Sequence, residues 1–332
     1  MNFIFGRENL ALTIFVPFDC YNNCPFCTSK KTYKTNPPSV SLVKSSVQSF
    51  FDDYAFPIKD VVFTGGEPMA NIHILSELLD LVPSKYNIYI NTTFTNKNLD
   101  EFIDLVNKID KIKGVNISRH SETYDSDCAV FHDIADDSMI KRIKKPVKIN
   151  CVVGKQVIEQ VVFRWENKNV ELCFREDYTT MQDDEYHLHD PYGIIPIELL
   201  RIGYHFHSHS QCNVCDTTRF VKDGNIVSFH KGKQHSSILH GDNLEINDLI
   251  INQEGDFDYD WDSNYTDKLA TYALLCNFRK RHMMTQAPIT EAVMPTSGCR
   301  GNYCTCAPTC GLRSRSYCGL SSVQYCGGYR GC

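Results

Sequence analysis

The chain has 332 residues and a formal net charge of −6, with 42% hydrophobic and 22% charged residues. This composition is typical of a soluble globular protein, and the length allows one large domain and a smaller one around a sizeable core. The acidic balance gives no reason to expect nucleic acid or an anionic membrane as a partner. No apolar run approaches the ~20 residues that a membrane span needs. Because the first residues also lack the basic and apolar regions of a signal peptide, we expect a cytoplasmic protein.

The first apolar run, residues 11–17, predicts a buried strand, and three of the 16 cysteines follow it: Cys20, Cys24 and Cys27. Three thiolates on one short loop can hold three corners of a 4Fe–4S cluster and leave the fourth iron without a protein ligand. An open metal position is typical of a catalytic site, whereas structural sites close their coordination shell. Zinc is the alternative, but zinc sites usually add a second cysteine pair or histidines further along the chain.

A second motif follows the next strand-like run, residues 61–64, and reads Gly-Gly-Glu-Pro at residues 65–68. The C-x3-C-x2-C loop, with Phe26 directly before its third cysteine, and this downstream segment together resemble the radical SAM superfamily. The resemblance implies a 4Fe–4S cluster held by the three cysteines. It also implies that S-adenosylmethionine (SAM) chelates the open iron through its amino and carboxylate groups.

Each residue of the second motif has an expected role. Gly65 and Gly66 lack a side chain that would obstruct a ligand, so their backbone groups can approach the methionyl ammonium of SAM. Glu67 is expected to hold the loop, and Pro68 to end the turn. The alternative is a plain strand-to-helix turn, in which glycines are routine.

Strand-like and helix-like segments alternate from residue 11 to residue 175. Strands are expected at 11–17, 59–64, 86–91, 112–118, 147–153 and 170–174, and helices at 41–54, 72–81, 99–109 and 156–166. Repeated βα units imply a parallel sheet. Six of them suit an α/β fold with a partial (β/α)6 TIM-like barrel, the form that the resemblance implies. The chemistry of such barrels lies at the C-terminal strand ends, where both motifs fall.

Residues at the other predicted strand ends are candidate SAM contacts. Arg119 could form a charge-assisted fork with the SAM carboxylate. The resemblance implies that Ser118 faces the ribose or carboxylate of SAM. Asn91, at the end of the third predicted strand, could face the nucleoside, and Val152 could supply an apolar contact to the adenine. Core packing or an ordinary surface position is the alternative for each of them.

A second candidate site, Cys212 and Cys215, lies beyond the barrel. A C-x2-C pair suits zinc or an auxiliary iron–sulfur cluster, as in the SPASM or twitch extensions of many radical SAM enzymes. The expected hairpin, residues 220–229, turns at Asp223-Gly224. No third cysteine follows it, and His230 stands there instead, so the ligand set stays open.

Three histidines, His205, His207 and His209, alternate along a predicted strand and would share one face. They could bind metal, or they could form the polar outer face of a half-buried strand. A helix is expected at residues 266–283. We therefore expect a radical SAM barrel at residues 1–200 and a twitch-like extension at 201–297.

The tail, residues 298–332, has seven glycines, seven cysteines and no acidic residue. It lacks apolar periodicity and cannot pack a core of its own without metal or crosslinks. It could ligate auxiliary clusters, serve as a flexible cysteine shuttle or metal store, or be an embedded peptide substrate.

The sequence thus favours a radical SAM enzyme. The resemblance implies that a reduced cluster cleaves SAM and that the resulting 5′-deoxyadenosyl radical removes a substrate hydrogen, with flavodoxin or ferredoxin as an electron donor. The extension slightly favours a peptide or protein substrate over a small metabolite. A non-catalytic iron–sulfur or zinc-binding protein on a barrel scaffold is the alternative of another class.

Overall fold

The computed structural model describes residues 2–6, 10–17, 20, 22, 24, 27, 39–120, 133–152, 158–175, 194–211, 215–232, 235–261 and 265–280. The chain divides into two compact units, residues 1–280 with 329–332, and residues 281–328. Every element described below belongs to the first unit. Phe26, Cys212 and the cysteine-rich tail lie outside the described residues.

A large sheet of eleven strands forms the centre of the first unit, in the order β14-β13-β2-β3-β4-β5-β6-β7-β10-β9-β8. Neighbouring strands from β13 to β10 run parallel, and the strands at both ends are antiparallel. The strands are β2 (Leu10–Val16), β3 (Ile58–Gly65), β4 (Asn87–Thr92), β5 (Ile112–Ser118), β6 (Val147–Val152), β7 (Glu171–Arg175), β8 (His205–Gln211), β9 (Cys215–Lys222), β10 (Asn225–Gly232), β13 (Asp248–Ile251) and β14 (Phe257–Asp258).

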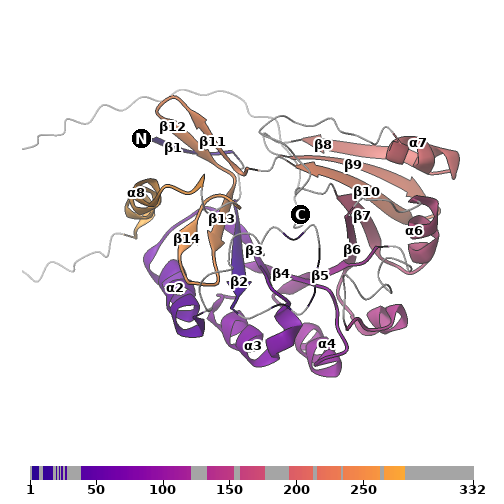
Figure 1. Cartoon of the computed structure of the whole chain (residues 1–332), viewed down its shortest axis with the longest axis horizontal. Helices are drawn as coiled ribbons and strands as arrows, with labels where there is room; N and C mark the ends of the chain where they lie inside the picture. Colours follow the sequence, from indigo (N-terminus) through magenta and orange to yellow (C-terminus); the bar gives the residue numbers. More distant parts are fainter. Residues whose placement is uncertain are drawn as a thin grey trace, which may run out of the picture. The chain divides into compact units, whose positions relative to one another are not determined.

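Within the described residues β14 and β8 do not pair, so the sheet stays an open arc rather than a closed barrel (Figure 1). The expected α/β fold with its six parallel strands is confirmed. The sheet is larger than expected because β10 adds beside β7 and β13 adds beside β2. A separate three-stranded sheet contains β1 (Asn2–Phe5), β12 (Asn243–Ile246) and β11 (Ser237–His240).

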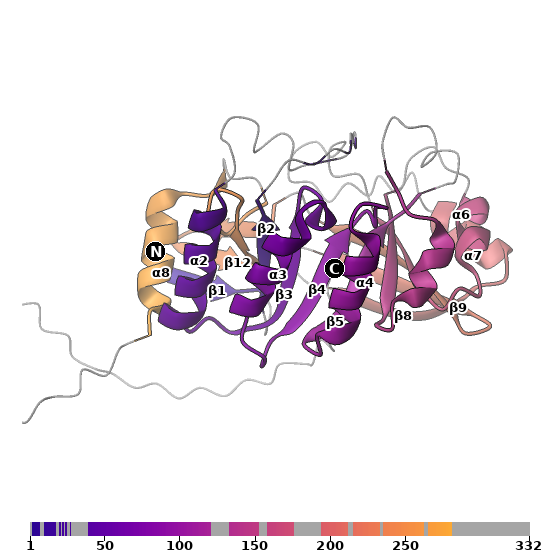
Figure 2. The ribbon, with the colours of Figure 1, turned by 90° about the horizontal axis from the view of Figure 1, so that it is seen from below.

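Four helices line the outer, convex side of the arc, as Figures 1 and 2 show: α2 (Val40–Asp53), α3 (Ile72–Leu81), α4 (Leu99–Lys108) and α6 (Ile158–Trp165). Two of them begin at side-chain caps. Oγ of Ser39 accepts from the backbone N–H of Leu42, and Oδ1 of Asn71 accepts from that of Ile74. Each cap satisfies a backbone donor that the first helical turn leaves without an intrahelical partner. The four predicted helices are therefore confirmed, with ends that differ by a few residues.

The period of two along each strand gives the sheet an apolar face and an opposite face that mixes polar and apolar side chains. The apolar face lies under the helices and forms the core, with fully or almost fully buried side chains such as Leu12, Ile14, Val61, Phe63, Ile90, Ile117 and Ile149. The other side chains point to the opposite, inner face of the arc. The helices in turn bury one stripe each and expose polar residues, as α4 does with Asp100, Glu101 and Asp104.

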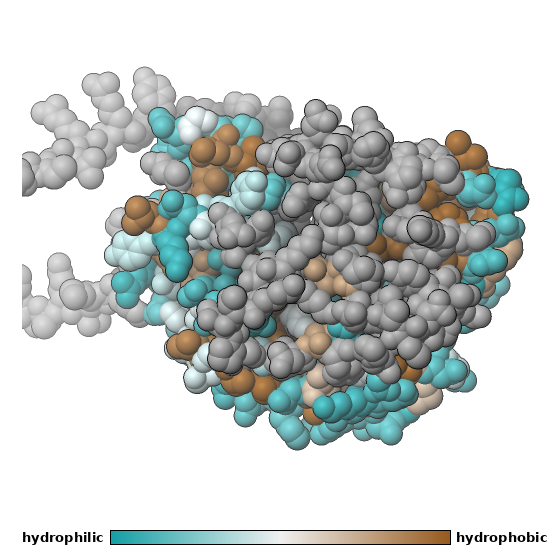
Figure 3. Space-filling model, in the orientation of Figure 1, coloured by the Kyte–Doolittle hydropathy of each residue, from teal (hydrophilic) through white to brown (hydrophobic). Residues whose placement is uncertain are grey.

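The exposed side of the helices is polar, and Figure 3 shows that the surface around α4 is largely hydrophilic. Hydrophobic surface appears on the side where Figure 1 places α7 (Ile194–Arg201). Ile197 and Leu200 of α7 and Phe206 of β8 are among the exposed large apolar residues. No helix in the described part of the chain is long and apolar enough to cross a membrane.

The predicted hairpin is confirmed as β9 and β10. Asp223 and Gly224 both have positive φ, +49° and +80°, the conformation that a two-residue type I′ turn requires. The helix expected to reach residue 283 is shorter, α8 (Lys268–Phe278). It ends there because Arg279 is extended and forms an isolated β-bridge with Tyr54.

The expectation that His205, His207 and His209 share one face is wrong. A register shift between Phe206 and Ser208 interrupts the alternation of β8. His205 pairs with Val221 and His209 with Thr218, three positions apart on β9, so these two histidines lie on opposite faces. A β-bulge of this kind adds a residue to one strand and reverses the facing of those that follow.

Candidate functional site

The two sequence motifs meet at the C-terminal edge of neighbouring strands. β2 and β3 run parallel, and their register ends with Val16 beside Gly65. The cysteine loop therefore leaves β2 beside the Gly-Gly-Glu-Pro segment that leaves β3. This is the edge at which parallel α/β sheets carry their ligands.

The three cysteines of the loop are each partly exposed. The backbone N–H of Cys27 donates to the carbonyl of Cys24 at 3.2 Å, which closes a turn between the last two. Among the described residues, no three His, Cys, Asp or Glu side chains are grouped so as to hold a metal ion. Convergence of the three thiolates on a cluster accordingly stays a prediction, and Phe26 lies outside the described residues.

Gly65 is required by the approach of two strands. Its φ is +130°, and a Cβ built on it would lie 2.8 Å from both the N and the O of Val16. A side chain at this position would strain the backbone and collide with β2. Gly65 thus lets the two motif-bearing strands end side by side, whatever ligand binds there.

Glu67 holds the segment after β3, as expected. Its carboxylate is fully buried and caps the short 3-10 helix η1 (Pro68–Asn71) by accepting from the backbone N–H of Met69 at 3.0 Å. Oε1 also accepts from Oγ1 of Thr92, and Oε2 accepts from the backbone N–H and Oγ1 of Thr93, at 2.5, 2.7 and 2.5 Å. Burial raises the pKa of Glu67, while the hydrogen bonds from Thr92, Thr93 and Met69 oppose that rise.

Thr93 connects this carboxylate to the cysteine loop. Nδ2 of Asn22 donates to Oγ1 of Thr93 at 2.9 Å, and that hydroxyl donates in turn to Glu67. Asn22 lies between the first two cysteines and is buried. Sequence reasoning missed Asn22, because a polar residue inside a cysteine spacing carries no signal of its own.

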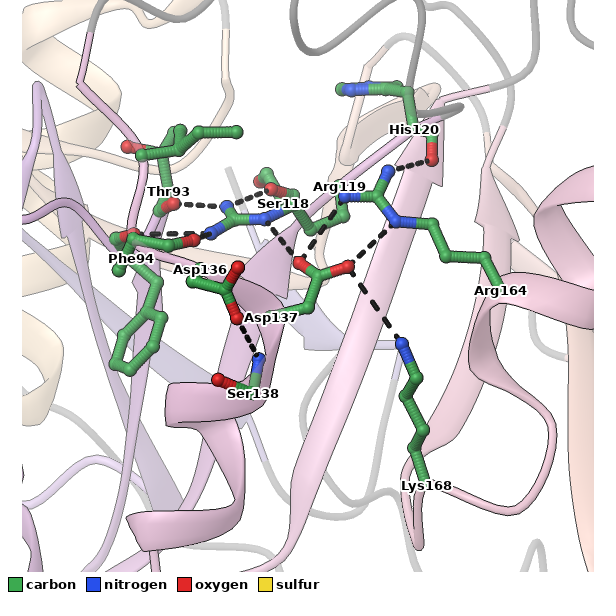
Figure 4. Close-up of polar contacts among 12 residues, drawn as sticks. Thr93, Phe94, Ser118, Arg119, His120, Asp136, Asp137, Ser138, Arg164 and Lys168 are labelled. Carbon is green, nitrogen blue, oxygen red and sulfur yellow. Dashed lines mark hydrogen bonds and ion pairs between the residues drawn. The ribbon is translucent and has the colours of Figure 1, made fainter.

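Arg119 is fully buried, so an ordinary surface position is wrong for this side chain. Its guanidinium donates to the carbonyls of Thr93, Phe94 and Ala135 and contacts the carboxylate of Asp137 (Figure 4). The structure thus places Arg119 among protein groups at the ends of β4 and β5. Its predicted contact with the SAM carboxylate stays a prediction.

The remaining predicted contacts share the inner face. Asn91 pairs with Asn116, and Nδ2 of Asn116 donates to Oδ1 of Asn91 at 2.8 Å. Ser118 stands beside Asn150 in the register of β5 and β6, and Val152 lies two residues further along β6. Asn91, Ser118 and Val152 therefore lie on the inner face, near the C-terminal edge that carries the motifs.

Asn150 adds an observation that points to a ligand. Its side-chain oxygen Oδ1 is buried and has no hydrogen-bond donor among the described residues. A buried acceptor without a donor is costly unless something supplies one. Its neighbours across the sheet are Ser118 on β5 and Cys173 on β7.

The second candidate site lies at the same edge of the sheet. Cys215 is buried and opens β9 opposite Gly232, the last residue of β10. His230 is also buried, and its Nδ1 lies 2.8 Å from Oγ1 of Thr217. Cys212 lies outside the described residues, so the ligand set of this site stays a prediction.

Comparison with known proteins supports the first motif. Residues 8–126 match a family described as a 4Fe-4S single cluster domain. The matched range contains the cysteine loop, the Gly-Gly-Glu-Pro segment and strands β2 to β5. This match confirms the iron–sulfur cofactor expected from the cysteine loop. No curated protein sequence matches the chain.

Several solved structures resemble the chain distantly. SuiB of Streptococcus suis bound to S-adenosylmethionine has 15% identity and a TM-score of 0.49, over 80% of this chain and 65% of that one. SuiB bound to precursor peptide SuiA has 18% identity and a TM-score of 0.44, over 58% and 47%. A histidine-tagged anSMEcpe with bound AdoMet has 16% identity and a TM-score of 0.40, over 54% and 55%.

The chain therefore spans between about half and two thirds of the length of the structures that it resembles.

Proposed function

We propose that this chain is a radical SAM enzyme. The observation that carries the proposal is the junction of the two motifs at the C-terminal edge of a parallel sheet. There the side chains of Asn22, Thr93 and Glu67 form one hydrogen-bonded chain. The family match to a 4Fe-4S single cluster domain supports the same interpretation.

The residues present fit both cofactors. Cys20, Cys24 and Cys27 are partly exposed cysteines on one loop, and their thiolates would hold three irons of a 4Fe–4S cluster. The buried Oδ1 of Asn150 is an acceptor suited to a hydroxyl or amino group of SAM. When bound, the cluster and SAM supply a one-electron cleavage of SAM and removal of a substrate hydrogen atom.

The chain's own residues would position SAM. Gly65 and Gly66 present backbone groups to its methionyl ammonium, and Glu67 fixes that turn with help from Pro68, the buried first residue of η1. Ser118 and Asn91 face the ribose and nucleoside from β5 and β4. Val152 gives the adenine an apolar contact on β6. Phe26, directly before the third cysteine, is the last of the proposed SAM contacts.

We also propose that the region after residue 200 carries a second metal site. Cys212 and Cys215 would supply two thiolates for zinc or an auxiliary iron–sulfur cluster. Support comes from the position of Cys215, which lies at the edge that carries the first motifs. The proposed organisation is a barrel at 1–200, a twitch-like extension at 201–297 and a tail at 298–332.

The proposed substrate is a peptide or protein, and an electron donor such as flavodoxin or ferredoxin would reduce the cluster. The preference rests on the region after residue 200, where β10, β9 and β8 extend the sheet beside β7. Mass spectrometry of an isolated substrate tests the preference, and a product found only on a small metabolite would contradict it.

The proposed activity is tested by anaerobic reconstitution with iron and sulfide, reduction, and incubation with SAM. The expected result is an iron–sulfur chromophore and formation of 5′-deoxyadenosine. A protein that holds a cluster and binds SAM, yet forms none of this product with or without cysteine-containing peptides, would favour a non-catalytic role. A colourless protein that takes up only zinc would contradict the proposal altogether.

A further inference from the structure

The carboxylate of Asp137 contacts two buried arginines, Arg119 and Arg164. Asp137 begins the 3-10 helix η2 (Asp137–Arg142), and its carboxylate lies 3.3 Å from Nε of Arg119 and 2.8 Å from Nε of Arg164. Nη2 of Arg164 donates to the same carboxylate at 3.2 Å, and Nζ of Lys168 lies at 4.0 Å. Figure 4 shows the carboxylate between Arg119, which directly follows β5, Arg164 of α6 and Lys168 after α6.

The two arginines use their remaining donors on backbone carbonyls at strand ends. Arg119 donates to Thr93 and Phe94, which follow β4, and to Ala135. Arg164 donates from α6 to the carbonyl of His120, two residues beyond β5, at 2.8 Å. The cluster therefore fixes where the chain leaves β4 and where it leaves β5.

Charge explains why this arrangement depends on Asp137. The side chains of Arg119 and Arg164 are 0% and 7% exposed, so both cations are largely removed from water. Burying a cation is unfavourable unless an anion and hydrogen bonds compensate it. Asp137 contacts both guanidinium groups and is itself only 18% exposed. Without its charge, the two like-charged groups would repel each other and move towards solvent.

The cluster is connected to the motif junction through Thr93. Arg119 binds the backbone carbonyl of Thr93, while the N–H and hydroxyl of the same residue bind Glu67. Its hydroxyl also accepts from Asn22 in the cysteine loop. A displacement of Arg119 would therefore be transmitted to both motifs over two hydrogen bonds.

We propose that Asp137 is a positioning residue for SAM binding. It holds Arg119 and Arg164 in place, and Arg119 then keeps Thr93 where Glu67 and Asn22 require it. This inference rests on the proposed function, because it names a residue that acts on the same site from outside. Asp137 itself lies among the arginines and is not a ligand of SAM or of the cluster.

The test is Asp137→Asn in the full-length, reconstituted protein, with Asp137→Glu as the charge-retaining variant. The matched control is Glu198→Gln, which removes a partly exposed carboxylate on α7 that lies 2.8 Å from Arg201. SAM affinity is measured by equilibrium dialysis well below each variant's unfolding temperature, and iron is counted per chain. In parallel, hydrogen–deuterium exchange is followed for peptides containing residues 20–27 and 92–96.

For Asp137→Asn we expect SAM binding to weaken about tenfold at equal iron content. Exchange should rise in both peptides, Asp137→Glu should recover most of the affinity, and Glu198→Gln should change neither measurement. An Asp137→Asn protein that unfolds earlier but binds SAM normally, with unchanged exchange at 92–96, would overturn the proposal and leave a structural ion pair.

The wild-type protein distinguishes a failure of the proposed function from a failure of the role of Asp137. If the wild-type protein holds its cluster but does not bind SAM, the proposed function fails, and the inference built on it fails with it. If the wild type binds SAM and the aspartate variants do not differ from it, only the role of Asp137 is overturned.

Discussion

The side-chain amide of Asn22 donates a 2.9 Å hydrogen bond to Oγ1 of Thr93, 71 residues further along the chain. This bond joins the cysteine loop after β2 to the end of β4. Because the same hydroxyl donates to Glu67, one threonine connects the proposed cluster loop with the proposed SAM loop. The geometry of both therefore depends on a side chain that belongs to neither motif.

Replacing Thr93 by valine removes this connection at almost constant volume. Asn22 then loses its acceptor and Glu67 loses a donor, so we expect a loss of about 1–3 kcal/mol in the free energy of unfolding. Chemical denaturation of the protein measures it. The control is Thr218→Val, whose hydroxyl contacts the exposed ring of His209 and should cost far less. Equal losses in both variants would show that the Thr93 hydroxyl has no special role.

Glu67→Gln tests whether the carboxylate is needed as a double acceptor. Oε1 accepts from the N–H of Met69 and Oε2 from the N–H of Thr93, and an amide can accept at only one of these ends. One backbone N–H would then face an NH2 group, with an expected loss of about 2 kcal/mol despite the removal of a buried charge. Thermal unfolding measures the loss, with Glu77→Gln, an exposed partner of Lys44, as control. A variant as stable as the wild type would show that Glu67 is held mainly as a neutral acid.

Gly65→Ala tests the close approach of β2 and β3. The added Cβ would meet the Val16 backbone at 2.8 Å in addition to the strain of a positive φ. Gly224→Ala is the matched control, because Gly224 also has a positive φ but nothing within 4 Å of the position that a Cβ would take. The control should lose about 1 kcal/mol from backbone strain alone, and Gly65→Ala clearly more. Similar losses would mean that the strands separate easily.

A pH dependence is expected from Asp258 on β14. Burial, with smaller contributions from Asp256 and Glu254, raises the pKa of Asp258 from 3.8 to about 6. The folded protein therefore favours the protonated acid. Its contribution to stability is complete below the unfolded pKa and is lost as the pH rises through about 6, by up to about 3 kcal/mol.

Asp258→Asn should remove this dependence. The free energy of unfolding of the wild type should fall more steeply between about pH 4 and pH 7 than that of the variant, as measured by urea denaturation across this range. The exposed Asp100→Asn serves as control and should follow the wild type. Parallel curves for wild type and Asp258→Asn would contradict the raised pKa.

The sequence was sufficient for the six strands and four α-helices between residues 11 and 175, but not for the 3-10 helices η1 and η2. The apolar runs and regular alternation of the strands and α-helices are local features of the sequence, and the same apolar residues form the core. The pairing of β13 with β2 and of β10 with β7 could not be predicted in this way, because it joins segments that are far apart in the chain. The bulge in β8 is local, but it was missed because one extra residue in the strand does not alter the alternation of histidines in the sequence.

In the candidate site, too, residues within motifs were predicted, whereas contacts between distant segments were not. Glu67 holds its loop as its place in the motif predicts, and Asn91, Ser118 and Val152 lie on the inner face. Arg119 was predicted from its place at a strand end, but its contacts depend on Asp137 and on carbonyls from two other segments. Asn22 and Asp137 carry no motif signal, because their partners are set only by the folded arrangement.

We propose that SAM binds the open iron of a cluster held by Cys20, Cys24 and Cys27. The most direct test of this binding is electron paramagnetic resonance of the reduced, reconstituted protein with and without SAM. We expect a 4Fe–4S signal whose g values change when SAM is added. This response should be absent in Cys24→Ala and retained in Cys276→Ala, which removes an exposed cysteine on α8. A signal that SAM leaves unchanged, or a response that survives in Cys24→Ala, would contradict the account.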